Sequence, residues 1–148
     1  MAYLVRFAST PHDLDAGFDL RYAVFHDEQQ VARALDRDAL DYNADHVVAY
    51  DDAGRCVGTG RLVRLDTRSA QIGRQATTPD HRRKGVGSAV LEALERLASL
   101  RGVTELVVHA QLHAEPFYRD RGYVTDGPQF QEHGVPHVRM RKPLPPLR

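Results

Sequence analysis

The stretch TPDHRRKGVGSAV, residues 78–90, places three consecutive cations directly before a Gly-x-Gly turn and a run with helical spacing. From Val86 onward the apolar residues recur at i, i+3, i+4 and i+7, which predicts a helix buried along one face. The start of that helix would present backbone N–H groups without intrahelical partners, and the positive end of its dipole, over residues 82–87. Gly85 and Gly87 let the backbone approach a ligand closely. The junction is therefore predicted to hold a phosphate group.

Two common nucleotide motifs are absent from this junction. It has no Gly-Lys-Ser/Thr run for a Walker loop, and Val90 stands where the dinucleotide fingerprint requires a third glycine or alanine. Neither ATP nor NAD is therefore the predicted ligand. The short motif alone is equally compatible with a solvated basic turn that leads into a surface helix, so the flanking elements have to decide between the two interpretations.

The elements on either side of the junction follow a recognisable order. Residues 46–78 contain three β-like runs separated by two aspartate-containing turn sequences, which predicts an antiparallel meander. After the helix, Gly102 supplies a left-handed stop, and VTELVVHAQL, residues 103–112, indicates a strand rich in β-branched residues. Residues 70–112 therefore run in the order strand, loop, helix, strand.

The N-terminal part begins with a strand and a helix. Residues 3–7 alternate in polarity, and Thr10 followed by Pro11 indicates the N-cap and first turn of a helix. The mixed, charged sequence from there to Leu40 predicts one helix and then a short helix or loop.

Towards the C-terminus the chain predicts two more elements. EPFYRDRGY, residues 115–123, indicates a short helix that begins near Pro116 and ends at Gly122. PHVRMRK, residues 136–142, alternates like a final strand, and an exposed strand there would pair with a second copy of the chain in a homodimer. The proline-rich tail, residues 143–148, cannot form regular sheet.

Composition sets wider limits. The chain of 148 residues, 42% of them hydrophobic, has the size of one ordinary domain, residues 1–148. Lys plus Arg and Asp plus Glu both total 20, so the formal net charge of zero predicts no broad attraction to nucleic acid or to a membrane. Cys56 is the only cysteine, which excludes an internal disulfide, and its apolar surroundings predict a buried thiol. No leader-like or bilayer-spanning apolar run occurs, so a soluble cytoplasmic protein is expected.

The junction and its context resemble a known family. Residues 82–87, Arg-Arg-Lys-Gly-Val-Gly, match the Arg/Gln-x-x-Gly-x-Gly/Ala signature of the GNAT N-acetyltransferases, between a strand that ends near Thr77 and a long helix. Further stretches resemble the ElaA-like branch over nearly the entire chain: RYAVFHDEQQV, DYNADHVVAY, VGTGRLV, IGRQATTPDHRRKGVG, VVHAQLHAEPFYRDRGY and FQEHGVPHVRMRK. Gln75 and Thr77 depart from that branch, which usually has valines there. Arg83 and His81 depart where it often has glycine and an aromatic residue.

The resemblance implies an α/β (α+β) fold. A central mixed, mostly antiparallel sheet of six to seven strands would splay in the middle and be flanked by about four helices. The pantetheine arm of acetyl-CoA, the implied co-substrate, would lie between the strands near residues 70–78 and 104–112 and extend the hydrogen bonding of one strand. The implied cofactor-binding residues are Ala76, Thr77, Arg82, Arg83, Lys84, Gly85, Val86, Gly87, Ser88 and Phe117.

The resemblance also implies a catalytic acid. Tyr118 resembles the family tyrosine that gives a proton to the departing CoA thiolate. A phenol with an ordinary pKa of about 10 stays protonated at neutral pH and can donate without being charged. The alternative is an aromatic side chain packed beside Phe117 and Tyr123. A backbone N–H near Ala76 and Thr77 would polarise the thioester carbonyl.

The base is less sharply indicated by the sequence. If residues 104–112 form a strand, His109 and Gln111 share the face opposite its apolar residues. His109, with an ordinary pKa near 6.5, is the candidate base, directly or through water, and a structural hydrogen-bonding histidine is equally compatible. Glu132 and His137 are alternatives for the base or for contacts with the acceptor.

Acceptor contacts are expected from the first third of the chain and from the late strands. The candidates are Arg21, Phe25, Glu28, Gln29, Arg74, Gln111, Glu132 and His137. For Arg61 and Arg74, ion pairing with Asp38, Asp41 or Asp45 is the stronger interpretation.

Eight histidines raise the question of a metal. His109 and His113 are four residues apart, as are His133 and His137. On a strand that spacing corresponds to about 13 Å, which is too long for two ligands of one ion. No metal site is predicted.

The predicted function is acetyl-CoA-dependent transfer to a primary amine of a small molecule or peptide. Because no nucleophile is expected near the loop, the amine would attack directly in a ternary complex. One alternative is a non-catalytic acyl-CoA-binding sensor. A further alternative comes from DYNADH followed by VGTGRLV, which also resembles the acyl-homoserine-lactone synthases.

Overall fold

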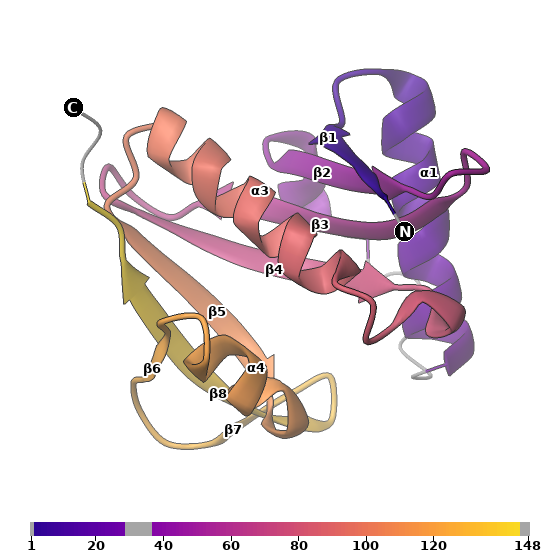
Figure 1. The fold of residues 1–148 in the computed structure, drawn as a ribbon. Coiled ribbons are helices and arrows are strands. Elements are labelled where there is room, and N and C mark those ends of the chain that lie inside the picture. Colours follow the sequence, from indigo (N-terminus) through magenta and orange to yellow (C-terminus); the bar gives the residue numbers. More distant parts are fainter. Residues whose placement is uncertain (1, 29–36, 146–148) are drawn as a thin grey trace.

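The computed structural model describes residues 2–28 and 37–145 (Figure 1). Eight strands of this described part form one sheet in the order β1-β2-β3-β4-β5-β8-β6, with β7 paired to β8. The strands are β1 Leu4–Phe7, β2 Asp45–Tyr50, β3 Cys56–Arg64, β4 Ser69–Thr77, β5 Glu105–Gln111, β6 Val124–Thr125, β7 Phe130–Glu132 and β8 Val135–Pro143. Only β4 and β5 pair in parallel among them, so the predicted mixed, mostly antiparallel sheet is confirmed, with eight strands rather than six or seven.

The helices begin where the sequence indicated. Within the described residues the α-helices are α1 Pro11–Tyr22, α3 Val86–Leu100 and α4 Glu115–Arg119; about four were expected for the whole chain. A π-helical segment, η1 Ala23–Glu28, continues α1, and short 3-10 turns are η2 Ala39–Tyr42, η3 Pro79–His81 and η4 Leu112–Ala114. The Thr10 side chain caps α1 by accepting a hydrogen bond from the Asp13 N–H at 3.1 Å. Gly102, with φ of 77°, follows α3 as its left-handed stop.

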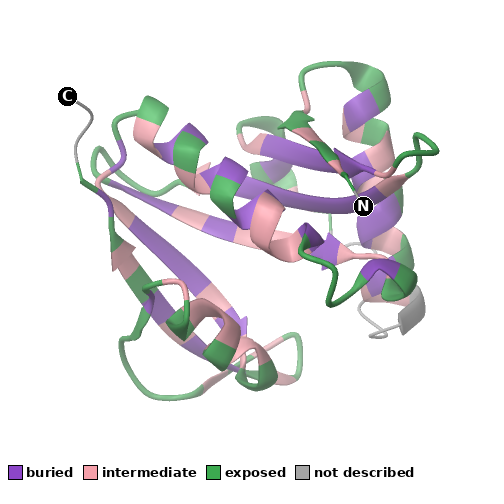
Figure 2. Cartoon of the chain, viewed as in Figure 1, coloured by how far each residue is buried: buried purple, intermediate pink, exposed green. Residues whose placement is uncertain are grey.

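Strand β3 lies between α1 and α3, and glycines at the contacts let both helices approach the strand closely. A Cβ added to Gly58 would lie 2.5 Å from Val86 Cγ1, and one added to Gly60 would lie 2.8 Å from Leu94 Cδ1, so α3 packs directly on the β3 backbone. On the opposite face, a Cβ on Gly17 of α1 would lie 2.9 Å from Thr59 Oγ1. The main core therefore lies between α3 and the sheet, where Figure 2 shows buried stripes on the helix and the central strands.

The sheet opens between β4 and β5. Their register runs only from Ser69 opposite Glu105 to Ile72 opposite Val108, and beyond that the two strands diverge, as Figure 1 shows. On the β3 side, Thr59 pairs with Ala76 and Arg61 with Gly73, so two residues of β4 oppose Gly60 alone. This β-bulge bends β4 away from β5 directly after their last pair.

The last strand is not a free edge. Strand β8 pairs with β5 along one edge and with β6 and β7 along the other. The expectation of an exposed edge at residues 136–142 is therefore wrong, and a homodimer stays a prediction without that support. None of the helices in the described ranges combines the length and the apolar character needed to cross a membrane.

Candidate active site

A cavity of about 230 Å³ lies where β4 and β5 part. Its walls come from β4, β5 and α4, from the turn η4, and from β7 and β8 with the turn between them. The lining residues are Phe25, Gln71, Ile72, Gly73, Arg74, Gln75, His109, Ala110, Gln111, His113, Ala114, Tyr118, Glu132, His133, Val135 and His137. Of the candidates from the sequence, Phe25, Arg74, Gln111, Glu132, His109, Tyr118 and His137 are thus brought together.

The glycine junction has the geometry that anion binding needs. Helix α3 begins at Val86 after Gly85, whose φ of 88° is left-handed, and no side chain caps the helix start. The N–H groups of Val86, Gly87 and Ser88 therefore lack intrahelical acceptors. The three cations of residues 82–84 are all exposed beside them.

The approach to the junction is anchored to the rest of the fold. His81 is buried, contacts Tyr3 Oη through Nδ1 at 3.1 Å and contacts an Arg55 guanidinium nitrogen through Nε2 at 3.0 Å. Arg82 Nε donates to the Thr77 carbonyl at 3.1 Å. These contacts fix the loop relative to the end of β4, so the junction is preorganised.

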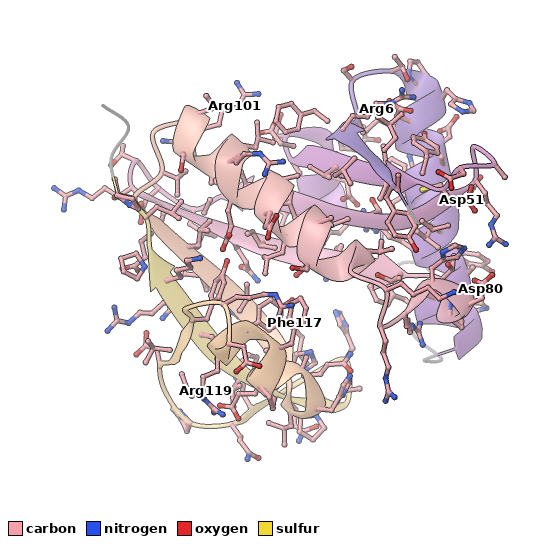
Figure 3. All side chains as sticks on the ribbon, viewed as in Figure 1. Arg6, Asp51, Asp80, Arg101, Phe117 and Arg119 are labelled. Atoms are coloured by element: carbon pink, nitrogen blue, oxygen red, sulfur yellow. The ribbon has the colours of Figure 1, made fainter. Side chains whose placement is uncertain are left out.

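Gly87 brings the start of α3 close to both α4 and the end of β4. A Cβ added to Gly87 would lie 3.9 Å from both Phe117 Cζ and Thr77 Oγ1, an ordinary contact distance. Phe117 lies between α4 and α3 (Figure 3), and the Arg121 guanidinium stacks over its ring at 3.8 Å. Arg121 Nε also donates to Ser88 Oγ at 3.3 Å.

The backbone of β4 directs Gln75 and Thr77, rather than Ala76, towards the opening. Thr78 N–H donates to the Val57 carbonyl of β3, and backbone polar groups alternate sides along a strand. The N–H and C=O of Thr77 and Gln75 therefore face away from β3. The Ala76 side chain is buried with Leu20 and Val24 under α1 and η1. The backbone groups of Ala76 therefore face β3, so Gln75 rather than Ala76 is the candidate for main-chain contact to a ligand, beside Thr77.

Tyr118 reaches the opening from α4. Its hydroxyl donates to Gln75 Oε1, and its ring meets Phe117 and Tyr123 edge-to-face at centroid distances of 5.1 and 5.5 Å. Burial raises the pKa of the phenol above its ordinary value. The side chain is therefore both a packed aromatic and a protonated donor at the cavity wall, which joins the two interpretations that the sequence left open.

His109 and Glu132 form the polar side of the cavity. Leu106, Val108 and Ala110 face the core, which confirms that His109 lies on the opposite face of β5. His109 Nδ1 lies 3.0 Å from Glu132 Oε1, and this hydrogen bond lowers the pKa of Glu132 against the opposing effect of burial.

His137 is held more tightly than His109. Its Nδ1 lies 2.7 Å from the Val135 carbonyl and must carry the proton, while its Nε2 lies 3.7 Å from the Glu132 carboxylate. His109 is more exposed at the cavity than His137, which is buried. Of the two, His109 has the arrangement of a base that is oriented by a carboxylate.

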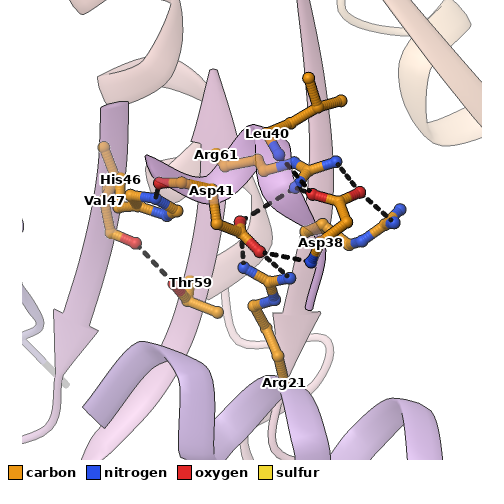
Figure 4. Close-up of polar contacts among 9 residues, drawn as sticks. Arg21, Asp38, Leu40, Asp41, His46, Val47, Thr59 and Arg61 are labelled. Carbon is orange, nitrogen blue, oxygen red and sulfur yellow. Dashed lines mark hydrogen bonds and ion pairs between the residues drawn. The ribbon is translucent and has the colours of Figure 1, made fainter. Parts of the chain in front are cut away.

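A buried ion-pair network adjoins the cavity through Arg74 (Figure 4). Arg21 is only 1% exposed and donates to both oxygens of Asp41, to which Arg61 also donates at 2.9 Å. Asp38 joins Arg61 to Arg74. Burial would raise the pKa of Asp41, but the bonds from Arg21 and Arg61 outweigh it and lower that pKa to about 2.

This network corrects one expected acceptor contact and qualifies another. Arg21 is not among the cavity-lining residues, and its guanidinium donates to Asp41, so the structure gives its assignment to acceptor binding no support. Arg74 lines the cavity while pairing with Asp38 at 3.2 Å. The Glu28 side chain and Gln29 lie outside the described residues.

Cys56 is half-buried rather than buried. Its thiol lies 3.6 Å from the Gly58 carbonyl, and burial raises its pKa to about 11. It is not among the residues that line the cavity. Across the described ranges, no group of three or more His, Cys, Asp or Glu side chains is arranged to hold a metal ion.

Sequence reasoning missed Gln75, Arg121, Gln71, His113 and His133 as site residues. Gln75 was noted only as a departure from a pattern. It stands among other polar residues, between Arg74 and Thr77, so no local signal in the sequence indicated that its amide would meet Tyr118. Arg121 carried no local signal, since its contacts with Ser88 and Phe117 depend on how α4 packs against α3.

Comparisons with known proteins agree with this geometry. Residues 9–144 match the model of the acetyltransferase (GNAT) domain family. The N-acetyltransferase YjcF of Bacillus subtilis, itself uncharacterised, is 34% identical over 136 residues, which cover 91% of this chain and 96% of YjcF. A solved structure from Lactobacillus plantarum, whose N-acetyltransferase assignment is provisional, has a TM-score of 0.90 at 30% identity and covers 97% of this chain and 99% of its own.

Escherichia coli ElaA is also similar in structure. Its TM-score is 0.81 at 22% identity, with 96% of this chain and 99% of that chain covered, so this likeness concerns the fold. The family match spans most of the chain and includes the glycine junction, the split strands and α4. The protein therefore belongs to the GNAT acetyltransferase family.

Proposed function

We propose that this protein is an acetyl-CoA-dependent N-acetyltransferase that moves an acetyl group to a primary amine by direct attack in a ternary complex. One observation carries the proposal. The pairing of β4 with β5 stops at Ile72, and Tyr118 lines the cavity that opens there. The uncapped start of α3 lies beside the end of the same strand, where Gly87 comes close to Thr77. A diphosphate site and a site for proton transfer would thus both lie along the last residues of β4.

Different residues of the chain would bind different parts of the cofactor. Backbone N–H groups of Val86, Gly87 and Ser88 would bind the diphosphate, with residues 82–84 adding positive charge. The edge of β4 that faces away from β3 at Thr77 and Gln75 would hydrogen-bond the pantetheine arm as a strand would. In support, N-acetylglutamate synthase from Neisseria gonorrhoeae, which shares the fold at 17% identity and a TM-score of 0.77, was solved with coenzyme A bound; this chain matches 35% of it.

The catalytic roles follow from position and chemistry. The Gln75 backbone N–H, which faces the opening, would stabilise charge on the thioester oxygen. His109, oriented by Glu132, would take a proton from the acceptor ammonium. Tyr118 would give its proton to the departing sulfur. Cys56 is unsuited to a covalent intermediate because its thiol is protonated at neutral pH and lies away from the cavity lining.

The cavity favours a small or slender acceptor. A volume of about 230 Å³ is below the range of about 300–1,000 Å³ that is typical of drug-sized ligands. The Glu132 carboxylate, whose pKa is lowered, would attract a cationic amine. A small-molecule amine or the end of a peptide side chain meets both conditions.

The test is thiol release by the purified protein. Acetyl-CoA is supplied with polyamines, amino acids or short peptides, and free thiol and acetylated product are measured. Transfer to at least one amine class is expected. Binding of coenzyme A in calorimetry without thiol release for any class would identify a sensor instead, and absence of both would reject the proposal. Detection of a lactone product would revive the third interpretation.

A further inference from the structure

Gln75 and Tyr118 connect the two halves of the sheet beyond the point where their backbones pair. Gln75 lies on β4, three residues past the last β4–β5 pair at Ile72, and Tyr118 lies on α4. The Tyr118 hydroxyl donates to Gln75 Oε1 across this opening. Both side chains line the cavity. The bond therefore lies at the position where the proposed function places the reacting sulfur.

The two ends of the Gln75 side chain have different surroundings. Its Cγ lies near the β3 backbone, 3.3 Å from where a Cβ on Gly60 would stand, beside Leu94 and Val90 of α3. Among the described residues, its amide has one hydrogen bond, the one from Tyr118. The stem is thus fixed by packing while the amide nitrogen remains available at the cavity.

This arrangement addresses a difficulty in the acid role of Tyr118. Burial disfavours the phenolate, so the phenol alone is a weak proton donor. A glutamine amide has both an acceptor oxygen and donor N–H groups, and half a turn about its terminal torsion exchanges them. A hydrogen bond from an N–H group to a phenolate is charge-assisted and stronger than the neutral bond it replaces.

We propose that Gln75 is a positioning residue for proton transfer, whose amide first accepts the Tyr118 hydroxyl and then turns to donate Nε2–H to the phenolate. The inference rests on the proposed function. As the C–S bond breaks, its electron pair stays on sulfur; the Tyr118 O–H bond breaks and an S–H bond forms. Gln75 Nε2 holds the resulting phenolate until the oxygen is reprotonated, by the surplus proton of the newly acylated nitrogen or by solvent.

A direct test measures the pKa of the Tyr118 phenol and does not depend on turnover. A ring-fluorinated tyrosine at position 118 lowers the intrinsic pKa into a measurable range and reports it by fluorine NMR. Gln75→Met keeps the stem but can neither accept nor donate these bonds, and Gln75→Glu can accept but, when ionised, cannot donate. Gln71→Met is the matched control, because Gln71 lines the same cavity on the paired part of β4.

The expected order of the phenol pKa is wild type and Gln71→Met lowest, Gln75→Met higher by about one unit, and Gln75→Glu highest. A glutamine that serves only as an acceptor stabilises the neutral phenol, so its loss would lower the pKa. A Gln75→Met value equal to or below that of the wild type therefore overturns the inference. The other ionisable groups around Tyr118 are Tyr123, Glu95 and Lys142 on its core side. On its cavity side they are Arg74, His109, His113, Glu132, His133 and His137, and all the variants share both sets.

Turnover with acetyl-CoA and the amine panel supplies the second readout. Gln75→Met should lower kcat about 10- to 100-fold, the range of a hydrogen bond to a charged group, with coenzyme A affinity within about threefold. In a Tyr118→Phe background the same change should have no further effect. An equal fall in kcat in the Tyr118→Phe background would show that Gln75 has only a structural role. If the wild type turns over and Gln75→Met turns over as fast as the wild type, this inference alone fails. If the wild type releases no thiol, both this inference and the proposed function fail.

Discussion

Gly87 of α3 and Phe117 of α4 face each other where the two helices meet, beside the proposed diphosphate site. A Cβ at Gly87 would stand 3.9 Å from Phe117 Cζ, an ordinary contact distance, so the backbone tolerates alanine there. Because Gly87 lies in the first turn of α3, a carboxylate at this position would also favour the helix dipole. An aspartate at position 87 should therefore weaken ligand binding while it leaves the stability of the fold unchanged or raises it.

Gly87→Asp should abolish coenzyme A binding without destabilising the fold. A carboxylate about 4 Å from a phosphate costs roughly 1–4 kcal/mol per charge pair, so the affinity should fall about 100-fold or more. Calorimetry measures the loss, and thermal unfolding should show a melting temperature that is unchanged or raised. Gly87→Ala is the matched control and should retain most of the affinity. Equal binding by the aspartate variant would contradict a phosphate site at the start of α3.

Tyr118→Phe should lower turnover with saturating acetyl-CoA by about 100-fold, because it removes the proton donor while keeping the ring. The control is Tyr123→Phe, which removes a buried hydroxyl that donates to Glu95 at 2.7 Å. That variant should lose about 1–3 kcal/mol of unfolding free energy and keep its turnover. Steady-state kinetics and urea unfolding distinguish the two effects. Unchanged turnover of Tyr118→Phe would exclude the acid role.

His109→Gln should slow transfer at neutral pH by about 100-fold, with recovery at higher pH. The recovery is expected because an acceptor amine that is already neutral needs no base. His113→Gln is the control, since His113 lines the cavity and has no contact with Glu132 among the described residues. A pH profile of kcat/KM for both variants provides the measurement. Parallel profiles for the wild type and His109→Gln would assign His109 a structural role.

The parts of the fold that could be predicted from the sequence depend on local pattern. The 3.6-residue period after Val86, the caps of α1 and α3, and the three runs of the meander each involve neighbours in the chain. The face of β5 that holds His109 followed from two-residue alternation. In each case the physical cause lies within about ten residues.

The parts that could not be predicted depend on long-range register. The bulge opposite Gly60 inserts one residue into β4 and so turns Gln75 and Thr77, rather than Ala76, towards the opening. The Gln75–Tyr118 bond joins residues 43 positions apart, and Arg21 reaches Asp41 only after α1 and η2 dock. A side chain's availability for binding is thus decided by partners that the local sequence does not identify.

Asp41 makes the stability of the fold sensitive to acid. Its pKa is lowered in the folded state from 3.8 to about 2, so its stabilising contribution is present above the unfolded value and is lost as the pH falls through the folded value. The shift corresponds to about 2 kcal/mol at neutral pH. Asp41→Asn should therefore be destabilised by about 3 kcal/mol at neutral pH, since Arg21 and Arg61 lose their shared charge.

The stability gap between the wild type and Asp41→Asn should narrow by about 1 kcal/mol between about pH 6 and about pH 3. Over that range Asp41 of the wild type takes up a proton in the unfolded chain, whereas in the folded protein, where its pKa is about 2, it stays largely ionised. Urea unfolding at each pH measures both proteins. Asp45→Asn is the control: its ion pair with Arg101 at 3.1 Å is exposed, so it should change stability by less than about 1 kcal/mol at any pH. A gap for Asp41→Asn that stays constant with pH would mean that the network stabilises the fold through packing and hydrogen bonds rather than through the charge of Asp41.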